Sequence, residues 1–264
     1  IAPITMEMGS SIITELTAQR VKKLVGLFPY QLKLSDSQSG QSSLDVLVKL
    51  KPSDDEVIMM INGMARMCDA KLASAHEKNK ERLGFEGCHI RELALYDQTD
   101  PRFVRHAPKV YQTLRDDKRE AYVVVMEKLE NMELMNSASD TSGWTDAHIT
   151  AAIDGMGQLQ SIWWGREAEL RETDWLGTVM TAEVMEELHP LWEGLAFHAY
   201  QEFPDLYQPK DLGVYQKLIS NIGTWWAELE SMPRTLIHND FNPRNLGFRR
   251  TENNEPLLCA YDWE

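Results

Sequence analysis

The sequence of 264 residues is poor in cysteine, poor in basic residues and free of long apolar runs. Its three cysteines, Cys68, Cys88 and Cys259, are odd in number and far apart, without the C-x-x-C spacing of a zinc site. This pattern argues against a disulfide framework and is typical of a protein of the reducing cytoplasm. We therefore expect a cytoplasmic protein with free thiols.

The absence of any stretch of about 18 apolar residues argues against a transmembrane helix. The segment from Ile1 to Gly9 also lacks the basic start and long apolar run of a secretory signal. Lysine and arginine number 27 against 41 acidic residues, which gives a formal net charge of −14. Such a charge weighs against nucleic acid as a partner. It suits a cationic substrate, although a solvated acidic surface is the simpler explanation.

The most informative stretch runs from His238 to Asn245 and reads H-x-D-x-x-x-x-N. A predicted strand over residues 257–261 would bring a second motif, D-W-E at Asp262, up beside it. Phosphoryl transfer needs an Asp to orient the attacking hydroxyl and accept its proton. It also needs an Asn and a second Asp to hold Mg²⁺. The candidates for these roles are Asp240, Asn245 and Asp262. A polar loop with an Asn-Pro turn is the alternative, and the spacing of the two motifs favours a functional site.

These two motifs resemble those of the aminoglycoside phosphotransferase and choline kinase family, small-molecule relatives of the protein kinases. Its members typically have H-G-D-x-x-x-x-N followed by D-[FW]-[ED]. The sequence departs from this pattern at Asn239, where Gly is usual, and it stops directly after Glu264. Because it also begins without Met, we expect residues to be missing at both ends. The resemblance implies a two-lobed, α+β, protein-kinase-like fold that uses ATP and Mg²⁺.

Two alternating stretches, residues 30–34 and 44–50, predict strands. The second contains Val-Leu-Val-Lys, similar to the kinase V-A-I-K. The similarity implies Lys49 as the contact to nucleotide phosphates, with Lys51 on the same strand face as the competitor. A solvated edge-strand lysine is the alternative. Further on, R-E-x-x-x-Y resembles the family's helix whose Glu pairs with this lysine, which implies Glu92 for that role. A surface Glu on an ordinary amphipathic helix is the other interpretation.

Two more segments resemble nucleotide-binding parts of the family. A small-residue turn resembles its phosphate-binding loop, although a hairpin turn without a ligand fits nearly as well. A predicted strand over residues 121–126 runs into M-E-K-L, similar to the family's hinge, whose backbone would bind an adenine edge. A core strand followed by a loop is the alternative. The residues implied are Gly9, Ser10 and Ser11 in the turn, and Met126, Glu127 and Leu129 in the hinge.

Helical periodicity covers residues 53–83 and, later, residues 147–164, 182–202 and 212–229. The first element resembles an insertion (about 53–84), because Lys49 and Glu92 are farther apart than in the family. Its apolar stripe is expected to pack in a core. The stripe consists of Val57, Met60, Ile61, Met64, Met67, Cys68 and Leu72. The tryptophans are likewise expected to fill a helical core rather than to form a cage for a cation.

The order of these parts predicts an N-lobe over residues 1–129, with a small antiparallel sheet and helices, and a mainly helical C-lobe over residues 130–264. The expected activity is ATP- and Mg²⁺-dependent phosphorylation of a hydroxyl on a small polar or cationic molecule. From the family, His238 would brace the catalytic loop. Arg244 would either neutralise charge on the transferred phosphate or pair with a neighbouring carboxylate.

Two alternatives stay open at this point. The phrase H-N-D-F-N-P-R-N also resembles phosphotransferases that modify ribosomally made precursor peptides. The acceptor would then be a Ser or Thr, and the inserted helical element could be a docking surface. The other alternative is an inactive kinase-like scaffold. Asn239 and Gln160 support it, because Gln160 stands where the family usually has His.

Overall fold

Antiparallel sheets and short helices make up the chain in this computed structural model, which describes residues 3–8, 25–36, 40–135, 141–177 and 179–263. The strands are β1 (Pro3–Met8), β2 (Gly26–Asp36), β3 (Gly40–Lys51), β4 (Val110–Asp116), β5 (Ala121–Glu127), β6 (Glu133–Leu134), β7 (Leu246–Arg250) and β8 (Pro256–Ala260). The helices are α2 (Asp54–Cys68), α3 (Ala70–Asn79), α4 (Cys88–Tyr96), α5 (Pro101–His106), α6 (Asp146–Gln160), α7 (Glu167–Arg171), α8 (Ala182–Glu187), α9 (His189–Glu202), α10 (Pro209–Ser220) and α11 (Ile222–Glu230). Two short 3-10 helices, η1 (Lys80–Arg82) and η2 (Pro243–Asn245), complete the set.

The chain divides into two units by its contacts. The first unit comprises residues 1–53, 89–168 and 235–264, and the second comprises residues 54–88 and 169–234. These units do not coincide with the predicted lobes on either side of residue 129. The first unit contains both the five-stranded sheet and the predicted catalytic loop. That lobe boundary stays a prediction. In the described ranges, no helix combines the length and the apolar character that crossing a bilayer requires.

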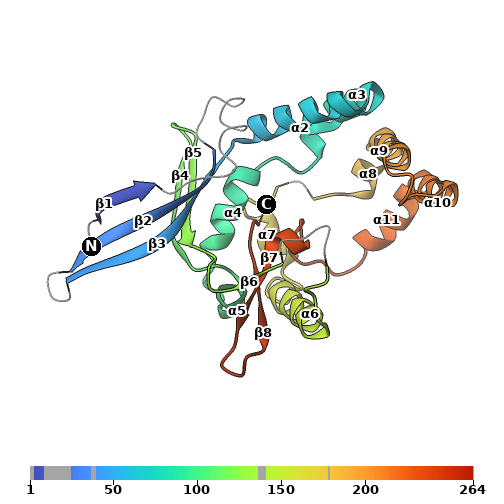
Figure 1. Cartoon of the computed structure of the whole chain (residues 1–264). Coiled ribbons are helices and arrows are strands. Elements are labelled where there is room, and N and C mark those ends of the chain that lie inside the picture. Colours follow the sequence, from blue (N-terminus) through green and yellow to red (C-terminus); the bar gives the residue numbers. More distant parts are fainter. Residues whose placement is uncertain (1–2, 9–24, 37–39, 136–140, 178, 264) are drawn as a thin grey trace. The chain divides into compact units, whose positions relative to one another are not determined.

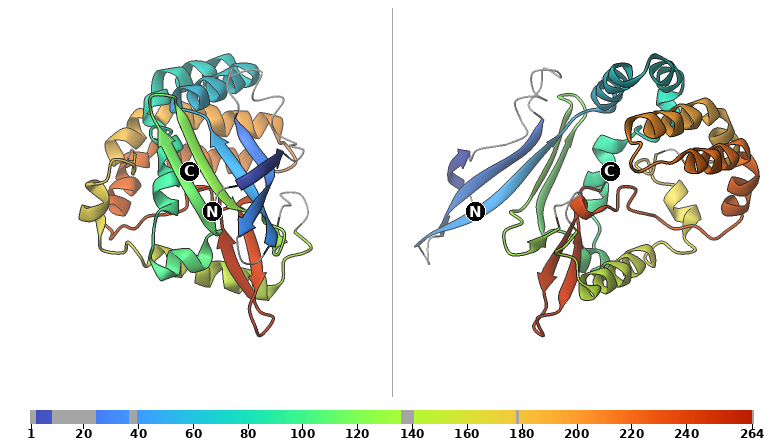
Figure 2. Two further views of the ribbon diagram at one scale, coloured as in Figure 1. Left: turned by 90° about the vertical axis from the view of Figure 1, so that its left-hand side faces the viewer. Right: turned by 45° about the vertical axis from the view of Figure 1, so that its right-hand side comes forward.

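The first unit contains a five-stranded antiparallel sheet in the order β1-β2-β3-β5-β4 (Figure 1). The α+β class and the small antiparallel sheet are therefore confirmed. Helix α4 lies against one face of this sheet in each view (Figure 2), and its His89 ring contacts Tyr122 at 4.2 Å between centroids. Because residues two apart on a strand share a face, Lys49 and Lys51 of β3 lie beside Val124 and Tyr122, their register partners on β5.

A smaller sheet, β6-β7-β8, lies in the same unit, and its strand β8 corresponds to the strand predicted over residues 257–261. Helix α6 packs against β8 closely. A Cβ atom added to Gly155 would lie 2.6 Å and 2.8 Å from atoms of the Leu258 side chain, so glycine is what permits this approach. The contact fixes β8, and with it the position at which the chain enters the D-W-E motif.

The second unit has its own apolar core, formed by buried residues of α3, α8, α9 and α11. These residues are Leu72, Met185, Leu188, Leu191 and Ile222. Trp192, Trp225 and Trp226 pack against them, which agrees with the prediction that tryptophans fill a helical core, whereas Trp164 is exposed and departs from it. The hydrophobic effect at this cluster gives the unit an interior of its own.

Three predicted helices are wrong in extent, because each is interrupted. The element at 53–83 breaks at Asp69, whose carboxylate caps α3 by accepting hydrogen bonds of 2.8 Å from the N–H groups of Lys71 and Leu72. The element at 182–202 breaks at Leu188, and α9 begins at His189 with Pro190 in its first turn, since proline has no N–H to continue an earlier helix. The element at 212–229 breaks at Asn221, whose side-chain amide donates to the Lys217 carbonyl.

The prediction that the methionine stripe of residues 57–72 packs in a core is wrong for most of its members. Leu72 is buried, but Met60, Met64 and Met67 of α2 are exposed. The buried positions of α2 are instead Asn62 and Ala65. Periodicity locates the apolar face of a helix, but it does not determine whether another element covers that face.

Candidate functional site

Lysines from β3, a glutamate from α4 and an aspartate from the end of the chain meet in the first unit. The Lys49 ammonium lies 2.7 Å from Oε2 of Glu92 and also pairs with Oδ1 of Asp262. Lys51 reaches the same Glu92 oxygen at 2.6 Å. The sequence therefore placed Lys49 and Glu92 together correctly, and both lysines that it left in competition contact Glu92.

Glu92 is fully buried, and its charge depends on these lysines. Burial alone raises the pKa of this carboxyl, because a desolvated carboxylate is unfavourable. The two ammonium groups outweigh that effect and lower the pKa of Glu92 to about 2. Its second oxygen, Oε1, accepts no hydrogen bond from the described residues. Glu92 is therefore an anion at neutral pH, held through one oxygen.

The loop from His238 to Asn245 orients its two proposed chemical groups toward each other. Oδ2 of Asp240 accepts a hydrogen bond of 2.9 Å from the Asn245 side-chain amide, and Oδ1 accepts one of 2.6 Å from Asn242. Asn242 also caps η2 by accepting from the Arg244 N–H at 2.9 Å. The Asp240 carboxylate is thus fixed by two neutral amides while the residue stays exposed.

Two hydrogen bonds join this loop to the chain that follows β8. Nε2 of His238 donates to the Tyr261 carbonyl at 2.9 Å, and the Tyr261 N–H donates to the Asn245 carbonyl at 3.0 Å. These bonds hold Asp262 beside the loop, as the sequence predicted. They also agree with the bracing role expected of His238. Burial lowers the pKa of its imidazole, which favours the neutral ring.

Asp262 has a left-handed backbone conformation with φ of +65°. Non-glycine residues adopt this region at a cost, and Asp and Asn tolerate it best because their short polar side chains bond locally. With this backbone conformation, the Asp262 carboxylate pairs with Lys49. Such strain is common where a side chain must be held for chemistry.

A series of aromatic ring contacts connects the loop at His238 to helix α4. The Trp263 ring lies 4.4 Å from the His238 ring and 5.3 Å from Phe103, which in turn neighbours Tyr96 at 6.5 Å. Tyr96 is four residues after Glu92, so both project from the same face of α4. Burial raises the pKa of Tyr96 well above its usual range, helped by the carboxylates of Glu92 and Asp262.

A cavity of about 20 Å³ lies under the loop, and His238, Phe241 and Gln160 are among the residues lining it. That volume is enough for one water molecule. Nδ1 of His238 is buried without a hydrogen-bond partner in the described residues, so it would benefit from such a bridge. Gln160, one of the two departures from the motifs that the sequence resembles, therefore places a polar side chain at this cavity.

The predicted hinge begins at the end of β5, and its residues differ in whether their polar groups are free to bind a ligand. Met126 is buried opposite Leu47 and Val110 inside the sheet. The Glu127 carboxylate is engaged by Arg249 and by the Lys109 N–H at 2.7 Å, and its own N–H donates to the Lys109 carbonyl. The Leu129 N–H, by contrast, donates no hydrogen bond within the described ranges. Of the three, Leu129 is the one with a backbone donor for a ligand.

The donor set fits a magnesium ion shared with phosphates better than a metal held by protein alone. No three His, Cys, Asp or Glu side chains group around a common point in the described part of the chain. Mg²⁺ usually takes one or two carboxylates and completes its shell with water and phosphate oxygens. The Asn245 amide nitrogen donates to Asp240, which leaves its oxygen for a cation. That oxygen and the Asp262 carboxylate could hold such an ion.

Other predicted site residues fall into two groups. Gly9, Ser10 and Ser11 lie outside the described residues. The Arg244 side chain is exposed and pairs with no carboxylate in the ranges that the structure describes, which favours its interaction with a ligand over a structural pair. The sequence assigned nothing to Tyr96, whose ring lies beside Phe103 in the series of aromatic contacts from the loop to α4, although its i+4 spacing from Glu92 was a usable signal.

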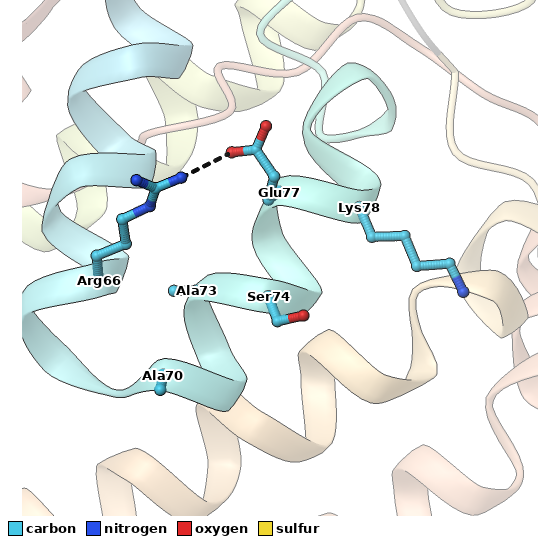
Figure 3. A pocket seen from close by; sticks show the side chains of 6 residues that line it. All are labelled: Arg66, Ala70, Ala73, Ser74, Glu77 and Lys78. Atoms are coloured by element: carbon cyan, nitrogen blue, oxygen red, sulfur yellow. Dashed lines mark ion pairs between the residues drawn. The ribbon is translucent and has the colours of Figure 1, made fainter.

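The second unit has a separate hollow of about 550 Å³ on α2 and α3 (Figure 3). Arg66 and Glu77 face each other there at 3.9 Å, and Lys78 points away from that pair. Ala70, Ala73 and Ser74 complete the lining. The hollow combines small side chains with charges of both signs, and it holds none of the residues predicted to carry chemistry.

All three cysteines are free, as the sequence predicted. Burial raises the pKa of the Cys259 thiol to about 12, so this sulfur is not a nucleophile at neutral pH.

Comparison of the chain with family models, with curated proteins and with solved structures found no match in any of the three.

Proposed function

We propose that this chain transfers phosphate from ATP, with Mg²⁺, to a hydroxyl of a small polar or cationic molecule, in the manner of aminoglycoside phosphotransferases. The observation that carries the proposal is the meeting of Lys49, Glu92 and Asp262 from three distant parts of the chain. Asp240 and Asn245 are tied to the same place through Tyr261. Phosphoryl transfer needs a lysine–glutamate pair, a metal-binding Asn and Asp, and a carboxylate for the acceptor.

In the proposed reaction, the acceptor oxygen forms a bond to the γ-phosphorus while the bond from that phosphorus to ADP breaks. The hydroxyl proton passes to Asp240, whose carboxylate is already oriented by Asn242 and Asn245. Lys49 contacts the phosphates and Arg244 neutralises charge on the transferred group. Bound Mg²⁺ would neutralise phosphate charge, held by Asn245 and Asp262. The backbone at Leu129 would bind the adenine edge.

The cellular compartment and the acceptor belong to the same proposal. Free, partly buried thiols suit a cytoplasmic protein. The net charge of −14 suits a cationic acceptor, because like charges repel and opposite charges steer a ligand toward a protein. Aminoglycosides and other amino-alcohols have this chemistry.

The direct test compares phosphate transfer by the wild type, Asp240→Asn and the control Asp154→Asn. Asp154 is an exposed aspartate on α6, so its neutralisation changes net charge equally. With a panel of polar and cationic alcohols, Asp240→Asn should lose at least about 100-fold in turnover, since general-base catalysis contributes that much. Its affinity for MgATP should stay close to the wild-type value. Full turnover in Asp240→Asn would contradict the assignment.

A second candidate function is phosphorylation of Ser or Thr in a ribosomally made precursor peptide. The exposed methionines of α2 favour it, because Met59 and Met67 are 57% and 78% exposed in the element that the sequence marked as a docking surface. Flexible, polarisable methionine side chains suit binding of varied peptides. Met59→Glu with Met67→Glu should then weaken peptide binding about tenfold or more, whereas Met232→Glu, an exposed methionine of the same unit, should not.

An inactive kinase-like scaffold is the third candidate, supported by Asn239 and Gln160. The hydrogen bonds that orient Asp240 and Asn245 favour an active enzyme over this alternative. A protein that bound MgATP but transferred phosphate to no alcohol and no peptide would fit the scaffold.

A further inference from the structure

A second lysine is buried with Glu92, and a simple lysine–glutamate pair would not need it. The Lys51 side chain is 1% exposed, against 13% for Lys49, and both ammonium groups lie within 2.7 Å of the same oxygen. Lysine is rarely buried unless it is paired, because its charge must leave water. The alternation of β3 explains how both lysines reach one face, but not why both are lysine.

The charges suggest separate tasks for the two lysines. Lys49 already serves two carboxylates, since it pairs with Asp262 as well as Glu92. In the proposed reaction it must also contact phosphates. A lysine drawn toward phosphate would weaken its pair with Glu92, and a fully buried carboxylate without a cation is strongly unfavourable. Lys51 lies deeper and can stay with Glu92 throughout.

The other partners of Glu92 are few. Its Oε1 has no hydrogen-bond partner among the described residues, and its Oε2 accepts from both lysines. No backbone N–H from the described chain therefore fixes this carboxylate. Its orientation depends on the two ammonium groups, and the loss of either one leaves the carboxylate with a single contact.

We infer that Lys51 is a positioning residue that holds Glu92 in place and keeps it charge-paired, so that Lys49 can turn to the nucleotide phosphates. This inference rests on the proposed function and extends it. Lys51 acts through Glu92 and does not touch the nucleotide itself. Its effect on nucleotide binding should therefore vanish when Glu92 is absent.

The experiment is a double-mutant cycle on MgATP affinity, measured by calorimetry for the wild type, Lys51→Met, Glu92→Gln and the double variant. Lys51→Met should weaken binding about tenfold, and the double variant should bind no more weakly than Glu92→Gln. Lys118→Met, in the exposed turn between β4 and β5, is the control for loss of one positive charge and should bind as the wild type does. Lys51→Arg, which keeps the charge, should recover most of the loss.

Thermal unfolding of each ligand-free variant shows whether it is folded, and Lys51→Gln, which also removes the charge, replaces Lys51→Met in the cycle if the latter does not fold. The inference is overturned if Lys51→Met binds MgATP as the wild type does. It is also overturned if the effects of Lys51→Met and Glu92→Gln multiply, because Lys51 would then act independently of Glu92. Absence of MgATP binding by the wild type would refute the proposed function, and this inference with it.

Discussion

At Glu92, folding and protonation are linked, because the carboxyl has a pKa of about 2 in the folded chain against 4.5 when unperturbed. A lowered folded-state pKa contributes stability that is fully present above the unfolded pKa. That contribution is lost as the pH falls from about 4.5 toward 2, since the unfolded chain then binds the proton first.

We predict that, between pH 5 and pH 3, the free energy of unfolding falls by about 2 kcal/mol more in the wild type than in Glu92→Gln. Glu92→Gln should itself be less stable at pH 7, since the buried Lys51 loses its ion pair with Glu92 and Lys49 keeps only its pair with Asp262. Urea unfolding of both proteins across this range measures the difference in slope. Parallel pH profiles would show that Glu92 is not the linked group.

The left-handed backbone of Asp262 determines which substitution removes its charge without straining the fold. Because its φ is +65°, alanine at this position would combine loss of the carboxylate with backbone strain. Asparagine tolerates the left-handed region as aspartate does and removes only the charge. Asp262→Asn therefore separates electrostatics from folding.

Among the elements, α6 and β8 hold the D-W-E motif in place through one close contact. We predict that Gly155→Ala lowers the free energy of unfolding by about 1–2 kcal/mol, because its Cβ would overlap the buried Leu258 side chain. The matched control lies on the same helix. A Cβ on Gly157 meets nothing within 4 Å, so Gly157→Ala should stabilise by up to about 1 kcal/mol through helix propensity. Equal effects of the two substitutions in chemical denaturation would contradict the packing described for α6.

The strands and the motif residues were predictable from the sequence because they depend on local patterns. Alternation in β3 identified the face that carries Lys49, and the H-x-D-x-x-x-x-N spacing identified a loop that the structure closes with hydrogen bonds. The contact between Lys49 and Glu92 was expected from family resemblance, not from the physics of either segment. The kinase-like nature of the fold and the activity remain proposals.

The rest depended on contacts that no local pattern encodes. The exposure of Met60 and Met64 could not be read from their periodicity, because a helix face is buried only if another element covers it. The breaks at Asp69 and Asn221 come from hydrogen bonds of one side chain each, which compete with a continuous helix. The sharing of Glu92 by two lysines required the position of α4 against the sheet.

At the scale of the whole molecule, the chain passes four times between the two units, yet all described residues of the proposed site lie in the first. A ligand that binds only the folded chain stabilises it by an amount that grows with the logarithm of its concentration relative to Kd. Nucleotide binding should therefore act through the first unit. The second unit contributes the exposed methionines, whose proposed partner is a peptide rather than a nucleotide.

The most direct measurement is calorimetric titration of MgATP into the wild type, Asp262→Asn and the control Asp154→Asn. The proposed site predicts binding in the wild type and the control, and about 10- to 100-fold weaker binding in Asp262→Asn, because a charged contact to the ligand is lost. Removal of Mg²⁺ with a chelator should reduce the difference between these proteins. Equal affinity in all three, or no binding in the wild type, would contradict a metal–nucleotide site at Asp262.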